Sequence, residues 1–171
     1  MMAMVPGKEI DNDPGDNACF ACGPRHPFGM HLRFFDDGEV VRAELPDRPD
    51  LVGWRGTWHM GLVTTALMDL VGWTLWERLG PCKPEGSFEV AMLAPLPMGP
   101  RVVLAARAHV ERDAAEVTAE ALVDGQPAMR LTSRARRATP EEAAKVLQLP
   151  NLPRSLRPAW ERVAAEPAVA R

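Results

Sequence analysis

The sequence predicts an α+β fold in which an antiparallel β-sheet wraps around one long central helix. Two observations carry this prediction. Residues 61–79 form an apolar run of helical length, and the segments on either side of it alternate apolar and polar residues as strands do. A helix that is apolar around most of its circumference must be covered, and the flanking strands can supply a sheet that covers it.

The central helix is expected to run from Gly61 to Leu79. Gly80 and Pro81 end it, because glycine leaves the helical register and proline donates no backbone hydrogen bond. At about 1.5 Å per residue the helix would approach membrane thickness, but Asp69 lies at its middle and three threonines dilute the apolar run. We therefore expect a core helix that is buried on all sides, not a membrane span.

A β-hairpin is expected before this helix. The segments Met30–Phe35 and Glu39–Leu45 both alternate apolar and polar residues, and Asp37-Gly38 between them is a strong turn signal. About four strands are expected after the helix, because the same alternation returns and Asp124-Gly125 marks another turn; they are a buried strand at 87–94 and further strands at 101–111, 116–123 and 129–136.

Three segments are expected along the chain: a flexible arm over residues 1–18, a compact domain over 19–138, and a Pro-rich helical extension over 139–171. In the extension, Thr139 can cap a short helix from Pro140 to about Leu147. A second helical stretch is expected at 160–165. Together these give an α+β domain with a short C-terminal helical addition.

Composition excludes several classes of partner. The net charge is -3 and there is no block of basic residues, so we expect no nucleic-acid partner. The three cysteines cannot all pair, and residues 1–5 lack the features of a signal peptide. The cytoplasm is the expected location, with no membrane partner.

A loop rich in turn residues carries four potential metal ligands, namely Cys19, Cys22, His26 and His31. They raise a zinc hypothesis. However, the two pairs lie closer together than the usual separation of about 12 residues, and His31 falls where a strand should begin. Small buried thiols that pack the loop are the favoured interpretation, so we expect no metal and no cofactor.

Three stretches of the chain together resemble a known family. They are CFACGPRHPFGMHLRF at 19–34, WHMGLVTTALMDLVGW at 58–73, and the segment from 90 to about 137 that begins VAMLAPLPMGPR. Their order and content resemble the hotdog-fold acyl-CoA thioesterases, in the branch of the PaaI-like and 4-hydroxybenzoyl-CoA thioesterases. The resemblance implies a hotdog fold, hydrolysis of an acyl-CoA, and a homodimer or a dimer of dimers (homotetramer).

The family pattern at the start of the helix is His-Gly-Gly with an acid eight residues after the first glycine, and two registers are open. In the first, His59 and Gly61 match and Met60 replaces the first glycine, so that Asp69 comes one place late. In the second, Gly61 and Asp69 match, but Met60 replaces the histidine and Leu62 the second glycine. The frequent asparagine of the family's first loop is His26 here.

The residues in and before the helix also suit the chemistry of thioester hydrolysis. Thioester hydrolysis needs an activated water or a nucleophile, and donors for the oxyanion. A carboxylate among apolar neighbours, Asp69, suits the first task, and an unpaired backbone N–H near Gly61 suits the second. About 12 Å of helix separates them, so they can share one carbonyl only across two subunits. We expect Asp69, Gly61 and His59 to be catalytic.

The expected substrate carries an aromatic or medium-chain acyl group, with the candidate substrate-binding residues Trp54, Trp58, Met60, Thr65 and Trp73, and Trp76 as a further possible pocket wall. Each tryptophan can instead be plain core packing. Asp69 can be a polar anchor at a dimer interface, and His59 a capping or packing residue. A non-catalytic acyl-CoA-binding protein is the alternative function, and a hydratase on the same fold is a third.

Overall fold

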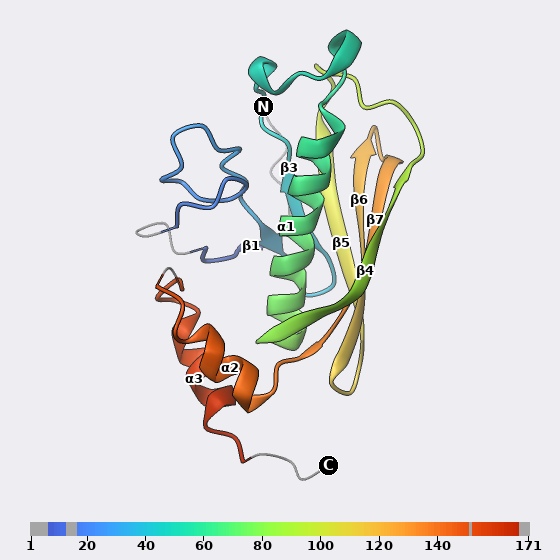
Figure 1. Ribbon diagram of the computed structural model, residues 1–171. Coiled ribbons are helices and arrows are strands. Elements are labelled where there is room, and N and C mark those ends of the chain that lie inside the picture. Colours follow the sequence, from blue (N-terminus) through green and yellow to red (C-terminus); the bar gives the residue numbers. More distant parts are fainter. Residues whose placement is uncertain (1–6, 13–16, 151, 168–171) are drawn as a thin grey trace.

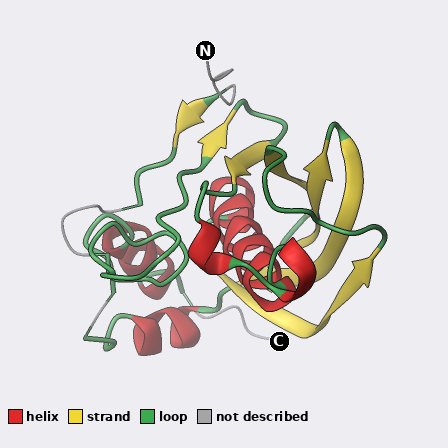
Figure 2. Ribbon diagram, turned by 90° about the horizontal axis from the view of Figure 1, so that it is seen from above, coloured by secondary structure: helices red, strands yellow, loops and turns green. Residues whose placement is uncertain are grey.

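The computed structural model describes residues 7–12, 17–150 and 152–167. One antiparallel sheet, in the strand order β1-β2-β3-β5-β6-β7-β4, curves around the helix α1, which runs from Met60 to Leu79 (Figure 1). Seen from above, the sheet lies around one side of α1, and loops and the short C-terminal helices lie on the other (Figure 2). The expected α+β fold is confirmed.

The strands are β1 (Lys8–Glu9), β2 (Phe35–Asp36), β3 (Val41–Glu44), β4 (Cys82–Met92), β5 (Val102–Glu111), β6 (Ala114–Val123) and β7 (Gln126–Arg137). Two single-turn 3-10 helices, Pro49–Leu51 and Trp54–Gly56, precede α1. The turn at Asp124-Gly125 joins β6 to β7 with both residues at positive φ, as its sequence indicates.

The core lies between α1 and the sheet. One side of the helix is fully buried and packs chiefly on β5 and β6; it presents Val63, Ala66, Leu67 and Leu70. The expectation that α1 is buried on all sides was wrong for the single chain, because Gly61, Met68 and Gly72 are exposed along another face. None of the helices in the described part of the chain is long and apolar enough to span a membrane.

The first hairpin is shorter than expected. Met30, Leu32 and Phe34 are buried as their alternation predicts, but only Phe35–Asp36 pairs with β3. The reason is that the backbone N–H groups of Met30 and Leu32 donate to the carbonyls of Phe20 and Ala21, at 2.8 and 2.9 Å. Residues 30–34 therefore bond to the loop that carries Cys19 and Cys22, here called the cysteine loop, instead of to a strand. These bonds hold the cysteine loop on the core.

The strand β4 differs from its expectation in length and burial. It begins at Cys82, five residues earlier than the predicted strand, and Lys83–Glu89 are exposed rather than buried. It forms the edge of the sheet, pairs only with β7 among the described strands, and shifts register between Glu85 and Glu89. Its outer side leaves backbone groups open for pairing.

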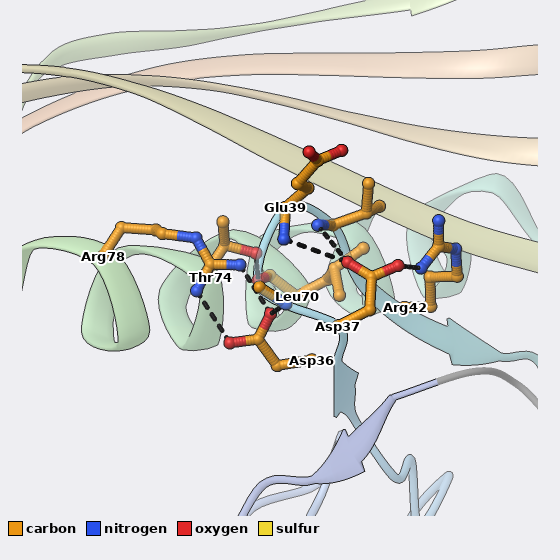
Figure 3. A network of polar contacts seen from close by, with 9 residues as sticks. Asp36, Asp37, Glu39, Arg42, Leu70, Thr74 and Arg78 are labelled. Carbon is orange, nitrogen blue, oxygen red and sulfur yellow. Dashed lines mark hydrogen bonds and ion pairs between the residues drawn. The ribbon is translucent and has the colours of Figure 1, made fainter.

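An ion pair fastens the end of α1 to the first hairpin (Figure 3). The guanidinium of Arg78 donates to both carboxylate oxygens of Asp36, at 2.7 and 2.5 Å. Next to it, the carboxylate of Asp37 accepts the backbone N–H groups of Glu39 and Val40 and pairs with Arg42, which closes the turn. The Asp36–Arg78 pair thus joins the C-terminal end of α1 to β2.

The C-terminal extension forms two helices, α2 (Pro140–Val146) and α3 (Arg157–Ala164). Thr139 and Glu142 make the capping box at the start of α2, as the sequence indicates. Trp160 of α3 packs against Trp76 of α1, with ring centroids 6.3 Å apart. The extension is therefore docked on the last turns of the central helix.

Part of the segment expected to be a flexible arm belongs to the sheet. Lys8 and Glu9 pair with β2, and Ile10 is buried, with its backbone N–H donating to the carbonyl of Phe34. Positions 1–6 and 13–16 of that prediction lie outside the described residues.

Candidate active site

Asp69 lies midway along α1, on the side of the helix that faces the cysteine loop. Its Oδ2 atom is buried and has no hydrogen-bond partner among the described residues. Burial raises the pKa of this carboxyl from 3.8 to about 7, and the negative charge of the nearby Cys19 thiolate adds to the effect. A carboxylate in this state can take a proton near neutral pH.

The loop that contacts Asp69 is held by Asn17. The Oδ1 atom of Asn17 accepts the backbone N–H of Cys19 at 2.9 Å, and its Nδ2 atom donates to the carbonyl of Asn12 and lies 3.4 Å from Sγ of Cys22. Asn17 is itself buried. This side chain therefore contacts both ends of the Cys-x-x-Cys turn.

The four potential metal ligands recognised in the sequence do not come together. The ring of His26 packs edge-on against Phe20, and Nδ1 of His31 lies 3.0 Å from the carbonyl oxygen of Gly23. A different group forms instead, in which Sγ of Cys19, Sγ of Cys22 and an oxygen of Asp69 all lie within 4.8 Å of one another. Three donors are one fewer than the four of structural zinc sites.

The start of α1 holds the other expected catalytic residues. His59 is the N-cap residue, without a side-chain cap, and its ring lies over Gly61: a Cβ on Gly61 would be 3.1 Å from Cε1 of His59 and 3.2 Å from Nδ1. The backbone N–H groups of Met60 and Gly61 donate to no acceptor within the described chain. The hydroxyl of Thr65 donates to the carbonyl of Gly61 at 2.9 Å. These N–H groups can receive an anion.

The aromatic candidates are spread over different environments. Trp58 is buried, and Trp73 packs on Phe34 with ring centroids 6.2 Å apart, so both contribute to the core. Trp54 is 78% exposed, and the guanidinium of Arg55 lies 4.4 Å from its ring centroid. These residues do not share one cluster with Asp69.

A hollow of about 680 Å³ lies beside Trp58, near the start of α1. Apolar side chains from Leu45 and Met98 line it together with Trp58, and Arg33 and Arg101 line it as well. The sequence did not indicate this hollow, because its lining comes from five separate segments of the chain.

Comparison with solved structures finds the same fold in bacterial proteins. The TT0310 protein from Thermus thermophilus is 22% identical, with a TM-score of 0.57, over 67% of this chain and 99% of that protein. A mutant form of the phenylacetic acid degradation protein PaaI from the same organism is 21% identical, with a TM-score of 0.56, over 64% of this chain and 95% of that one.

A mutant form of the thioesterase PA1618 from Pseudomonas aeruginosa is 23% identical, with a TM-score of 0.51, over 63% of this chain and 81% of that one. No model of a known protein family matches the chain, and no curated protein does. The resemblance inferred from the three sequence stretches is thus confirmed at the level of the fold. The chain has the hotdog fold that the PaaI-like thioesterases share.

Proposed function

We propose that this protein is an acyl-CoA thioesterase in which the carboxylate of Asp69 serves as the general base or the nucleophile. The observation that carries the proposal is the state of Asp69: one oxygen is buried without a partner among the described residues, and the pKa lies near 7 because of burial. Burying a carboxylate without a full set of partners costs free energy, and such groups concentrate at catalytic sites.

The oxyanion donors are the backbone N–H groups at the start of α1, at Met60 and Gly61. They lie about 12 Å along the helix axis from Asp69 of the same chain, too far to act on the same carbonyl carbon. The site is therefore shared by two chains in a dimer, or in a dimer of dimers. The exposed face of α1 at Gly61, Met68 and Gly72, and the open edge strand β4, support such a dimer.

The acyl-CoA substrate class fits the hollow beside Trp58. Its apolar lining suits an aromatic or medium-chain acyl group or the pantetheine arm, and the cations of Arg33 and Arg101 suit phosphates. Arg33 also pairs with Glu9, and Arg101 with Glu44. Both arginine side chains are exposed, so a phosphate would compete with weak ion pairs.

The names of two proteins of similar structure support hydrolysis of a thioester as the reaction class. One is called a phenylacetic acid degradation protein and another a thioesterase. The three free cysteines of this chain are consistent with a reducing compartment, and we infer the cytoplasm.

The test is release of free CoA from a panel of benzoyl-, phenylacetyl-, hexanoyl- and acetyl-CoA, followed by chromatography, because a thiol reagent would also react with Cys19. We expect hydrolysis of at least one aromatic or medium-chain thioester, with acetyl-CoA slower. Tight binding of every thioester without CoA release would instead identify a non-catalytic acyl-CoA-binding protein. The replacement of a motif glycine by Met60 is what makes that alternative worth testing.

A further inference from the structure

Two of the free thiols stand on one tight turn. The backbone N–H of Gly23 donates to the carbonyl of Cys19 at 2.8 Å, so Cys19 and Cys22 project from the same turn and approach one another. A Cβ at position 23 would lie 2.3 Å from the backbone nitrogen of Cys19, so this turn requires glycine. The geometry of the pair is built into the loop.

The two thiols are placed unequally. Cys19 is exposed, whereas Cys22 is 4% exposed and lies beneath it. A Cys-x-x-Cys pair with one accessible and one covered sulfur is the arrangement in which the first sulfur can attack an external molecule and the second can reach only the first. The third cysteine, Cys82, stands on β4 and takes no part in this cluster.

Local hydrogen bonds support the same division. The thiol of Cys22 and the backbone N–H groups of Cys22 and Ala21 point at Sγ of Cys19 and lower the pKa of that thiol to about 5. The pKa of Cys22 is raised, by its bond to Cys19, by burial and by the nearby Asp69 carboxylate. These surroundings favour the thiolate form of Cys19 and the protonated form of Cys22.

Asp69 completes the cluster. Its Oδ1 atom lies 3.8 Å from Sγ of Cys19, and the thiol of Cys22 is also within hydrogen-bonding reach of the carboxylate. The other oxygen, Oδ2, has no partner in the described chain. A buried carboxylate next to a covered thiol can take the proton that the thiol must lose before it attacks.

We propose that Cys19 and Cys22 form a dithiol–disulfide redox centre that exchanges with disulfides of small thiols, with Asp69 as the acceptor of the Cys22 proton. The thiolate of Cys19 attacks one sulfur of the small disulfide; that S–S bond breaks and one small thiolate leaves. Cys22 then gives its proton to Asp69 and attacks Sγ of Cys19, and the second small thiolate leaves.

The overall exchange transfers two electrons from the cysteines to the small disulfide. The two cysteines are oxidised to one disulfide, and the small disulfide is reduced to two thiols, one protonated through Asp69 and one by water. None of these steps uses an acyl-CoA, so the proposal stands apart from thioester hydrolysis. Disulfides that form in reducing compartments are usually transient and serve catalysis or redox sensing.

The experiment uses the full chain, reduced and freed of reductant, with glutathione disulfide as the probe and the intact mass after acid quenching and alkylation as the readout. We expect loss of two hydrogens, with Cys82 alone still alkylated. Cys22→Ser should accumulate a mixed disulfide of glutathione on Cys19. Cys19→Ser should react at least about tenfold more slowly, because the covered Cys22 cannot replace the accessible thiolate.

Cys82→Ser is the matched control and should behave as the unaltered protein does. Asp69→Asn should still form the mixed disulfide but resolve it more slowly. Thermal melts of each variant establish that it is folded. If Cys22→Ser is not folded, Cys22→Ala takes its place in the experiment. Equal reactivity of Cys19 and Cys82, or a Cys22→Ser variant that forms no mixed disulfide, overturns the proposal. So does one equivalent of bound zinc that protects both thiols until it is chelated.

Discussion

The thiol sulfur of Cys19 lies 3.8 Å from Oδ1 of Asp69, although the two residues are 50 positions apart in the chain. This contact joins an N-terminal loop to the middle of the central helix. It places a second ionisable group against the carboxylate on which the proposed hydrolysis depends, and the charge of Cys19 helps to raise the pKa of Asp69.

The pH dependence of hydrolysis should report this pair. Asp69 must be ionised to act as a base, so kcat/KM should rise with pH through an apparent pKa near 7. Cys19→Ser removes the neighbouring negative charge and should shift the midpoint to lower pH, although not to 3.8, because burial is the larger cause. Rate profiles in reducing buffer measure the shift, and Cys82→Ser should leave the midpoint in place.

Stability should show the opposite trend with pH. The pKa of Asp69 is higher in the folded state than in the unfolded state. The contribution of this difference to the free energy of unfolding is therefore fully present below about pH 4 and is lost as the pH rises through about 7. The melting temperature of Asp69→Asn relative to the unaltered protein should therefore increase between pH 4 and pH 8. Calorimetry across that range would contradict this account if the difference stayed constant.

The exposed face of α1 should be an interface between two copies. Met68 is 45% exposed at the centre of that face, and Met68→Glu would bury an unpaired charge in the proposed dimer. We expect the unaltered protein to be at least a dimer by light scattering and the variant to be a monomer without thioesterase activity. Leu149→Glu, at a similarly exposed site in the C-terminal extension, should remain a dimer. A fully active monomer would rule out a site shared by two chains.

The contact between His59 and Gly61 should couple the two residues. In Gly61→Ala the new methyl group would lie 3.1 Å from the His59 ring, so the ring must shift by a few tenths of an ångström. We expect kcat/KM to fall about tenfold, and the double variant with His59→Ala to lose less than the product of the two single effects. Purely multiplicative losses in the four-protein cycle would show that the two residues act independently.

The Asp36–Arg78 ion pair should contribute to stability in a way that exposed pairs do not. Its side chains are 15% and 18% exposed, and Arg78 holds the pKa of Asp36 below its usual value. Asp36→Asn should lower the free energy of unfolding by about 1–3 kcal/mol at pH 7, with the difference shrinking below about pH 4. Glu116→Gln, in a pair whose side chains are 52% and 75% exposed, should change it by less than about 0.5 kcal/mol.

The central helix, the turns and the capped C-terminal helix could be predicted because each depends on local residues. Gly80 ends α1, Asp124-Gly125 turns the chain, and Thr139 with Glu142 caps α2, all without help from distant contacts. The length of β2 could not be predicted in this way, because the donors of Met30 and Leu32 are taken by a loop whose position only the tertiary fold sets.

The candidate site was predictable in part for the same reason. A carboxylate inside an apolar helix singled out Asp69, but nothing in the sequence connects it with Cys19 and Cys22. The histidines of the same loop offered a more familiar ligand spacing, and they turn to Phe20 and Gly23 instead. The asymmetry of the two thiols depends on the burial of Cys22, which is a tertiary property.

The most direct test of the thioesterase account is Asp69→Asn, with turnover and melting temperature measured on the same protein. Asparagine keeps the size of the side chain and can still hydrogen-bond, but it can neither take a proton from water nor attack a thioester. We therefore expect turnover of the best acyl-CoA substrate to fall by about 10² to 10⁴. Binding of that substrate should survive, and the melting temperature should stay level or rise. Near-normal turnover in a well-folded variant, or a lower melting temperature with turnover reduced only in proportion to folded protein, would contradict the account.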